Sequence, residues 1–134
     1  MHAPPDQKGV TMRYMGFVKM DHTLGEPPQA LIDAMGSHIE QSIADGTFVD
    51  GGGLYSETFR TEIRVRAGQV TSTDGPFAEA KEEVGGYSVL EFRDHAEAVE
   101  GARQLAELHR KHWPEWEGAI EVRRIAGPDD VGGQ

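Results

Sequence analysis

Among the six histidines of the chain, His38 has the setting best suited to proton transfer. It falls within a stretch, residues 27–45, whose apolar side chains recur at helical spacing. The residues of that stripe are Leu31, Met35, Ile39, Ser42 and Ile43. His38 lies at the edge of the stripe, roughly 70° from its centre. A partly sheltered imidazole with a pKa of about 6.5 can exchange a proton at neutral pH. The alternative is a histidine that makes one hydrogen bond at the boundary of the core.

Asp74 begins the constrained turn Asp74-Gly75-Pro76. An aspartate in a turn usually accepts a hydrogen bond from the backbone N–H two residues later. Here that residue is Pro76, which has no N–H. The carboxylate must therefore reach Phe77 or Ala78, as at the start of a helix, or stay free to face a ligand. Both interpretations stay open.

A charged run follows the turn, with Lys81 among Glu79, Glu82 and Glu83. Such runs are usually solvated faces. Lys81 is the member that could instead hold an anionic ligand.

Residues 74–82 read DGPFAEAKE, and Gly85-Gly86-Tyr87 follow. This string resembles the signature of the YCII-related (DGPF) domain family, and the resemblance extends over about residues 12–125. It implies a catalytic pair of a histidine on the first helix and an aspartate in the later loop. His38 and Asp74 occupy the matching places here, with Gly75, Pro76 and Lys81 as candidate ligand-binding residues.

The resemblance leads to two hypotheses about function. The first is a homodimeric protein that binds a small polar ligand, or an enzyme that uses His38 as acid and base with Asp74 as its orienting group. The second is a non-catalytic regulatory module, because domains of this family often accompany extracytoplasmic-function sigma factors.

The chain predicts the order strand, helix, strand, hairpin, strand, helix, strand. The expected segments are strands at 12–20, 47–54, 87–92 and 119–125, helices at 27–45 and 94–112, and a hairpin of 61–65 with 69–73. This order indicates an α+β fold, a ferredoxin-like split βαβ sandwich with an inserted β-hairpin. The first strand is apolar at nearly every position, which favours two covered faces. Sheet-to-sheet packing of a homodimer, the dimeric α+β barrel that the family resemblance also implies, would cover the second face.

The other histidines give weaker evidence of a functional role. His109 and His112 have a spacing that could bind a metal, but no HExxH motif or acidic cluster accompanies them. We expect His109 to fill the inner face of the second helix beside Trp113, and we expect no metal and no cofactor.

Composition narrows the class of protein. The net charge of −10 argues against direct binding to nucleic acid. No apolar run approaches the roughly 18 residues of a membrane span. The chain has no cysteine, which agrees with a cytoplasmic location. We expect one domain over residues 12–126, with flexible tails at 1–11 and 127–134.

Overall fold

The computed structural model describes residues 11–56, 58–74, 83–128 and 130. Its elements are β1 (Met12–Met20), the short 3-10 helix η1 (His22–Leu24), α1 (Gln29–Ala44), β2 (Phe48–Gly53), β3 (Thr61–Arg66), β4 (Gln69–Asp74), β5 (Glu83–Phe92), α2 (His95–His112) and β6 (Gly118–Arg124). The predicted order of strands and helices is confirmed.

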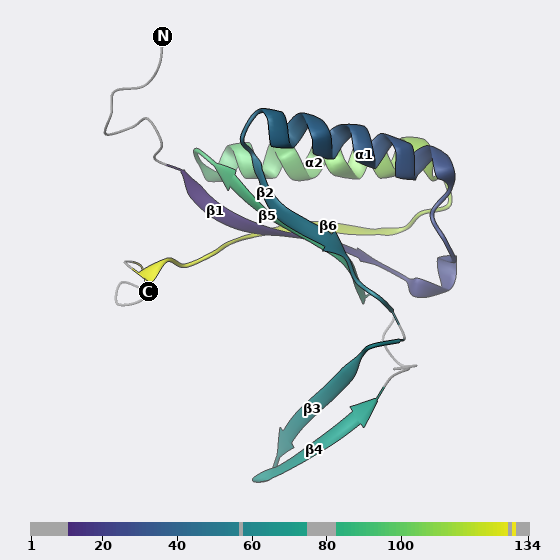
Figure 1. Ribbon diagram of the computed structural model, residues 1–134, viewed down its shortest axis with the longest axis vertical. Helices are drawn as coiled ribbons and strands as arrows, with labels where there is room; N and C mark the ends of the chain where they lie inside the picture. The colour runs from purple at the N-terminus through teal and green to yellow at the C-terminus, as the bar shows by residue number, and fades with distance from the viewer. Residues whose placement is uncertain (1–10, 57, 75–82, 129, 131–134) are drawn as a thin grey trace.

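Four strands form one antiparallel sheet in the order β2-β5-β1-β6. Both α-helices that the structure describes cover the same face of this sheet (Figure 1). This is the expected ferredoxin-like α+β arrangement, with β3 and β4 as the inserted hairpin. The sheet is open within the chain, so the protomer by itself forms no closed barrel.

Local signals in the sequence set several element boundaries. Helix α1 ends in a Schellman motif: Gly46 has a φ of +84°, and the Thr47 amide donates to the Ser42 carbonyl at 2.9 Å. The hairpin turns at Ala67-Gly68, where both residues have positive φ, as a type I′ turn requires.

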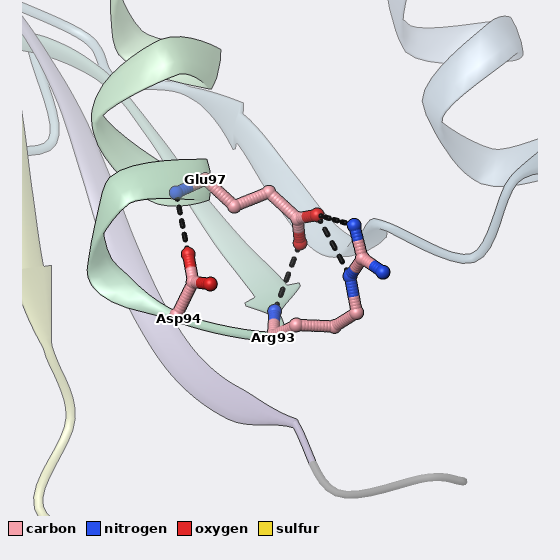
Figure 2. A network of polar contacts seen from close by, with 3 residues as sticks. All are labelled: Arg93, Asp94 and Glu97. Carbon is pink, nitrogen blue, oxygen red and sulfur yellow. Dashed lines mark hydrogen bonds and ion pairs between the residues drawn. The ribbon is translucent and has the colours of Figure 1, made fainter. Parts of the chain in front are cut away.

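Helix α2 begins at the predicted Asp94. Its carboxylate accepts a hydrogen bond from the Glu97 amide at 2.8 Å (Figure 2). Glu97 in turn accepts from the Arg93 amide at 2.8 Å and pairs with the Arg93 guanidinium. These contacts satisfy amides that the first turn of a helix would otherwise leave unpaired.

The covered face of α1 is rotated from its predicted position. Ile43 is exposed, which corrects its assignment to the buried stripe, whereas Leu31 is buried and Ser42 is half-buried. The covered face is therefore centred near Leu31. His38 lies only about 20° from Leu31 around the helix, so it stands well inside this face. On helix α2, Ala98 is fully buried and Val99 is exposed.

The core is small and lies toward one end of the sheet. Tyr14, Phe92 and Ala98 form its buried cluster, and Met12, Leu90 and Val122 pack against it. The Tyr14 hydroxyl and His95 Nδ1 are 3.1 Å apart, so this buried polar group has a partner.

Candidate functional site

Side-chain size divides the helix-covered face of the sheet into two regions. In the first region Tyr14 lies opposite Leu90, and Leu90 lies opposite Phe48. Further along the same face, Gly51 lies opposite Ser88 and Gly53 lies opposite Gly86. Gly16 of β1 lies on the other side of Ser88. Partners across a ladder point to the same face. The part of β2 and β5 beneath the helices is therefore a floor of glycine and serine, which we call the glycine floor.

An open hollow lies between this floor and the helices. Its wall on α1 includes Leu31, Met35, His38, Ile39 and Ser42. The hollow has a volume of about 2170 Å³, more than the roughly 300–1,000 Å³ of an ordinary ligand cleft. A small ligand would fill only part of it.

The glycines of the floor differ in the space above them. A Cβ added at Gly51 would lie 2.8 Å from both the Phe48 ring and the Tyr87 carbonyl oxygen. A Cβ added at Gly86 would lie 3.5 Å from the Gly52 carbonyl oxygen and 4.0 Å from Val18, which are ordinary contacts. Gly51 is thus required by close packing, whereas a Cβ at Gly86 would fit with ordinary contacts.

His38 is the imidazole of the α1 wall. It is half-buried and lines the hollow, and the residues that the structure describes offer it no hydrogen bond. Asp45, seven residues further along the chain, interacts with it electrostatically. The pKa of Asp45 is lowered mainly by hydrogen bonds from Thr47, with a smaller contribution from His38. A half-buried imidazole without a hydrogen bond among the described residues is available to a ligand.

His109 is a second imidazole of the hollow, and its possible role was missed from the sequence. It is 4% exposed, as its predicted place on the inner helix face requires. Its Nδ1 lies 2.9 Å from the Leu105 carbonyl oxygen, which can only accept, so Nδ1 carries the hydrogen. Burial lowers the pKa of His109. In the neutral ring Nε2 is therefore an acceptor, and no partner for it occurs within the described ranges. The signal in the sequence was a histidine at the centre of an otherwise apolar helix face.

Asp74 has a partner that the sequence argument did not consider. The Thr61 hydroxyl donates to its carboxylate at 2.7 Å across the hairpin, and Asp74 is exposed at the end of β4. The described residues include no hydrogen bond between His38 and Asp74. Gly75, Pro76 and Lys81 lie outside the described residues.

An ion pair stands at the side of the hollow nearest the hairpin. Arg60 lies 2.5 Å from the Glu83 carboxylate and also donates to the Ser56 carbonyl oxygen at 2.9 Å. Arg60, Glu83 and Thr61 all line the hollow. The Thr61 hydroxyl connects Asp74 to this side of the hollow.

A model of the YCII-related domain matches residues 12–126 of the chain. The chain belongs to the YCII-related domain family. No curated protein matches it. In the part of the chain that the structure describes, no helix is long and apolar enough to cross a membrane.

Proposed function

We propose that this YCII-related protein binds a small molecule in the hollow above the glycine floor and that His38 exchanges a proton with it. The observation that carries the proposal is a half-buried imidazole, without a hydrogen bond among the described residues, on the wall of a hollow whose floor is glycine and serine. Ligand sites combine apolar walls with a few polar groups that fix orientation. The apolar wall here is supplied by Leu31, Met35 and Ile39. The polar groups are supplied by His38 and Ser88.

The lining favours a ligand with an apolar body and a hydrogen-bonding group. The charged residues that line the hollow, among them Asp45, Arg60 and Glu83, lie outside α1 and the glycine floor. A charged group placed between α1 and the floor would therefore lose hydration without compensation. The acceptor at His109 Nε2 suits a hydroxyl or N–H group. The glycine floor suits a flat molecule, because backbone approaches it closely.

We also propose that the protein forms a homodimer through the uncovered sheet face, which is the face opposite the helices. The residues of that face alternate with those beneath the helices. Its apolar side chains are Met15, Phe17, Tyr87 and Val89, and the ion pairs Arg13–Glu91 and Lys19–Glu121 lie beside them. Apolar centres with polar rims are typical of interfaces.

A thermal-shift screen of small molecules tests the roles of His38 and Asp74. It uses the wild type and the variants His38→Ala, Asp74→Ala and His112→Ala. His112 is the control, because it is a half-buried helix histidine that does not line the hollow. We expect compounds that raise the Tm of the wild type and His112→Ala but not of His38→Ala.

Two outcomes of the screen separate the hypotheses. Loss of the response in Asp74→Ala would support the paired role of Asp74, which stays a prediction. Responses like the wild type in His38→Ala and Asp74→Ala would refute the acid–base proposal. The sigma-factor association also stays a prediction, tested by pull-down with a co-encoded sigma factor.

A further inference from the structure

His109 is a deeply buried polar side chain on the wall of the hollow. It is 4% exposed and lines the hollow from α2. Leu105 and Trp113, four residues before and after it on the same side of the chain, line the hollow too. Buried polar atoms in folded proteins are nearly always hydrogen-bonded. No described residue donates a hydrogen bond to His109 Nε2, so the partner of this atom comes from the contents of the hollow.

The turn after α2 fixes the plane of the His109 ring. Pro114 ends the helix because it has no N–H to donate, and the Trp116 amide donates to the Trp113 carbonyl oxygen at 2.9 Å. This turn brings the Trp116 indole onto the imidazole, with ring centroids 4.7 Å apart, within the range of favourable aromatic pairs. A Cβ added at Gly118 would lie 2.7 Å from the Trp116 ring, so this glycine makes room for the indole.

A hydrogen bond fixes the direction of Nε2. The Nδ1 hydrogen of His109 points to the Leu105 carbonyl oxygen, 2.9 Å from Nδ1 and on the same helix. Because the two ring nitrogens lie on different sides of the imidazole, Nε2 points away from the backbone of α2. No hydrogen bond joins His109 to Trp116, whose buried Nε1 has no partner in the described part of the chain. The indole therefore holds the imidazole by packing alone and leaves Nε2 to the hollow.

Nε2 of His109 is an acceptor at neutral pH. Burial lowers the pKa of His109, so the ring is neutral there, and with the hydrogen on Nδ1 the other nitrogen can only accept. A hydroxyl or an N–H group satisfies it. A carbonyl or ether oxygen brings no hydrogen and leaves a buried acceptor unpaired, which is the costly case. A site of this kind discriminates between two compounds of similar shape more strongly than an apolar pocket does.

We propose that His109 determines which ligands the hollow accepts, namely flat and largely apolar compounds with a neutral hydroxyl or N–H group directed at Nε2. The inference rests on the ligand site proposed above and adds the class of ligand to it. His38 on α1 exchanges a proton with the ligand, whereas His109 on α2 selects and orients it. Because Leu105 and Trp116 already hold the imidazole, binding orders no further side chain at this position.

Two matched pairs of compounds test the selection. They are phenol with anisole and indole with N-methylindole, and in each pair only the first member carries a hydrogen-bond donor. NMR titration measures the Kd of each compound. We expect the donor member to bind the wild type at least about tenfold more tightly than its partner. In His109→Phe, which keeps a ring but has no acceptor, the two members should bind within about threefold of each other. His112→Phe is the control and should keep the preference of the wild type.

The ¹⁵N signal of His109 Nε2 gives a second measurement, which a purely structural role of His109 would not affect. It should shift with phenol and stay in place with anisole. Circular dichroism checks that the variants fold, and if His109→Phe does not, the wild-type pairs and this signal decide the question.

The outcomes separate failure of the selection from failure of the ligand site. If both members of each pair bind equally and shift the resonances of Gly53 and Ser88, the selection by His109 is wrong and the ligand site stands. A donor preference that survives in folded His109→Phe would also overturn the selection. Absence of binding by all of these compounds would overturn it as well, and the thermal-shift screen would still test the ligand site.

Discussion

Two glycines of the same floor should respond in opposite ways to an added methyl group. Gly51→Ala would place its Cβ 2.8 Å from the Phe48 ring and from the Tyr87 carbonyl oxygen. The ring can shift, but the carbonyl belongs to the backbone of the neighbouring strand. Gly86→Ala would place its Cβ no closer than 3.5 Å to any other atom, in the space above the floor.

The contacts of each added Cβ determine the expected change in the free energy of unfolding. Overpacking of the kind expected at Gly51 costs about 1–3 kcal/mol. Replacing a strand glycine by alanine without strain stabilises by roughly 0.5–1 kcal/mol. The free energies of unfolding of the two variants should therefore differ by about 1.5–4 kcal/mol, with Gly86→Ala at or above the wild type.

Urea unfolding followed by circular dichroism measures this difference. With a slope of about 1–3 kcal/mol per molar urea, the midpoints should be separated by about 0.5–4 M. If Gly86→Ala is destabilised as much as Gly51→Ala, the space above Gly86 is filled, and the reasoning that places a hollow there is refuted.

Two further predictions concern α2. Asp94→Ala removes the acceptor for the Glu97 amide and should lower the free energy of unfolding by about 1 kcal/mol; urea midpoints equal to the wild type would contradict this account of the cap. Burial lowers the pKa of His109, so below about pH 6.5 the unfolded chain binds more protons than the folded chain. The stabilising contribution of the neutral ring is present above that pH and is lost as the pH falls. Wild type should therefore lose more stability than His109→Gln between about pH 7.5 and pH 5, and parallel profiles would show that His109 does not titrate differently on folding.

The sequence predicts those features that depend on neighbouring residues. Gly46 ends α1 and Ala67-Gly68 turns the hairpin because of local backbone preferences. Asp94 begins α2 because its side chain caps the helix. The family signature also predicts the fold, because members of one family share the arrangement of their strands and helices.

Features that depend on residues far apart in the chain could not be predicted from the sequence. Ile43 looked like part of the buried stripe, but the orientation of α1 on the sheet decides which side is covered. For Asp74 the sequence left open a local partner at Phe77 or Ala78 or a free carboxylate. It gave no sign of Thr61, because only the hairpin register brings that residue opposite Asp74. The hollow itself arises where Gly51 and Gly86 come to lie on adjacent strands, which no local pattern reveals.

The central claim is that the hollow above the glycine floor is a ligand site. The most direct measurement is a ¹H–¹⁵N NMR titration of wild type and Gly86→Val with the compounds selected by the thermal-shift screen. We predict that shifts in the wild type concentrate at Gly51, Gly53, Ser88 and His38, and that Gly86→Val, whose side chain fills the space above the floor, loses them. Shifts that persist in Gly86→Val, or that concentrate on another surface, would contradict the claim.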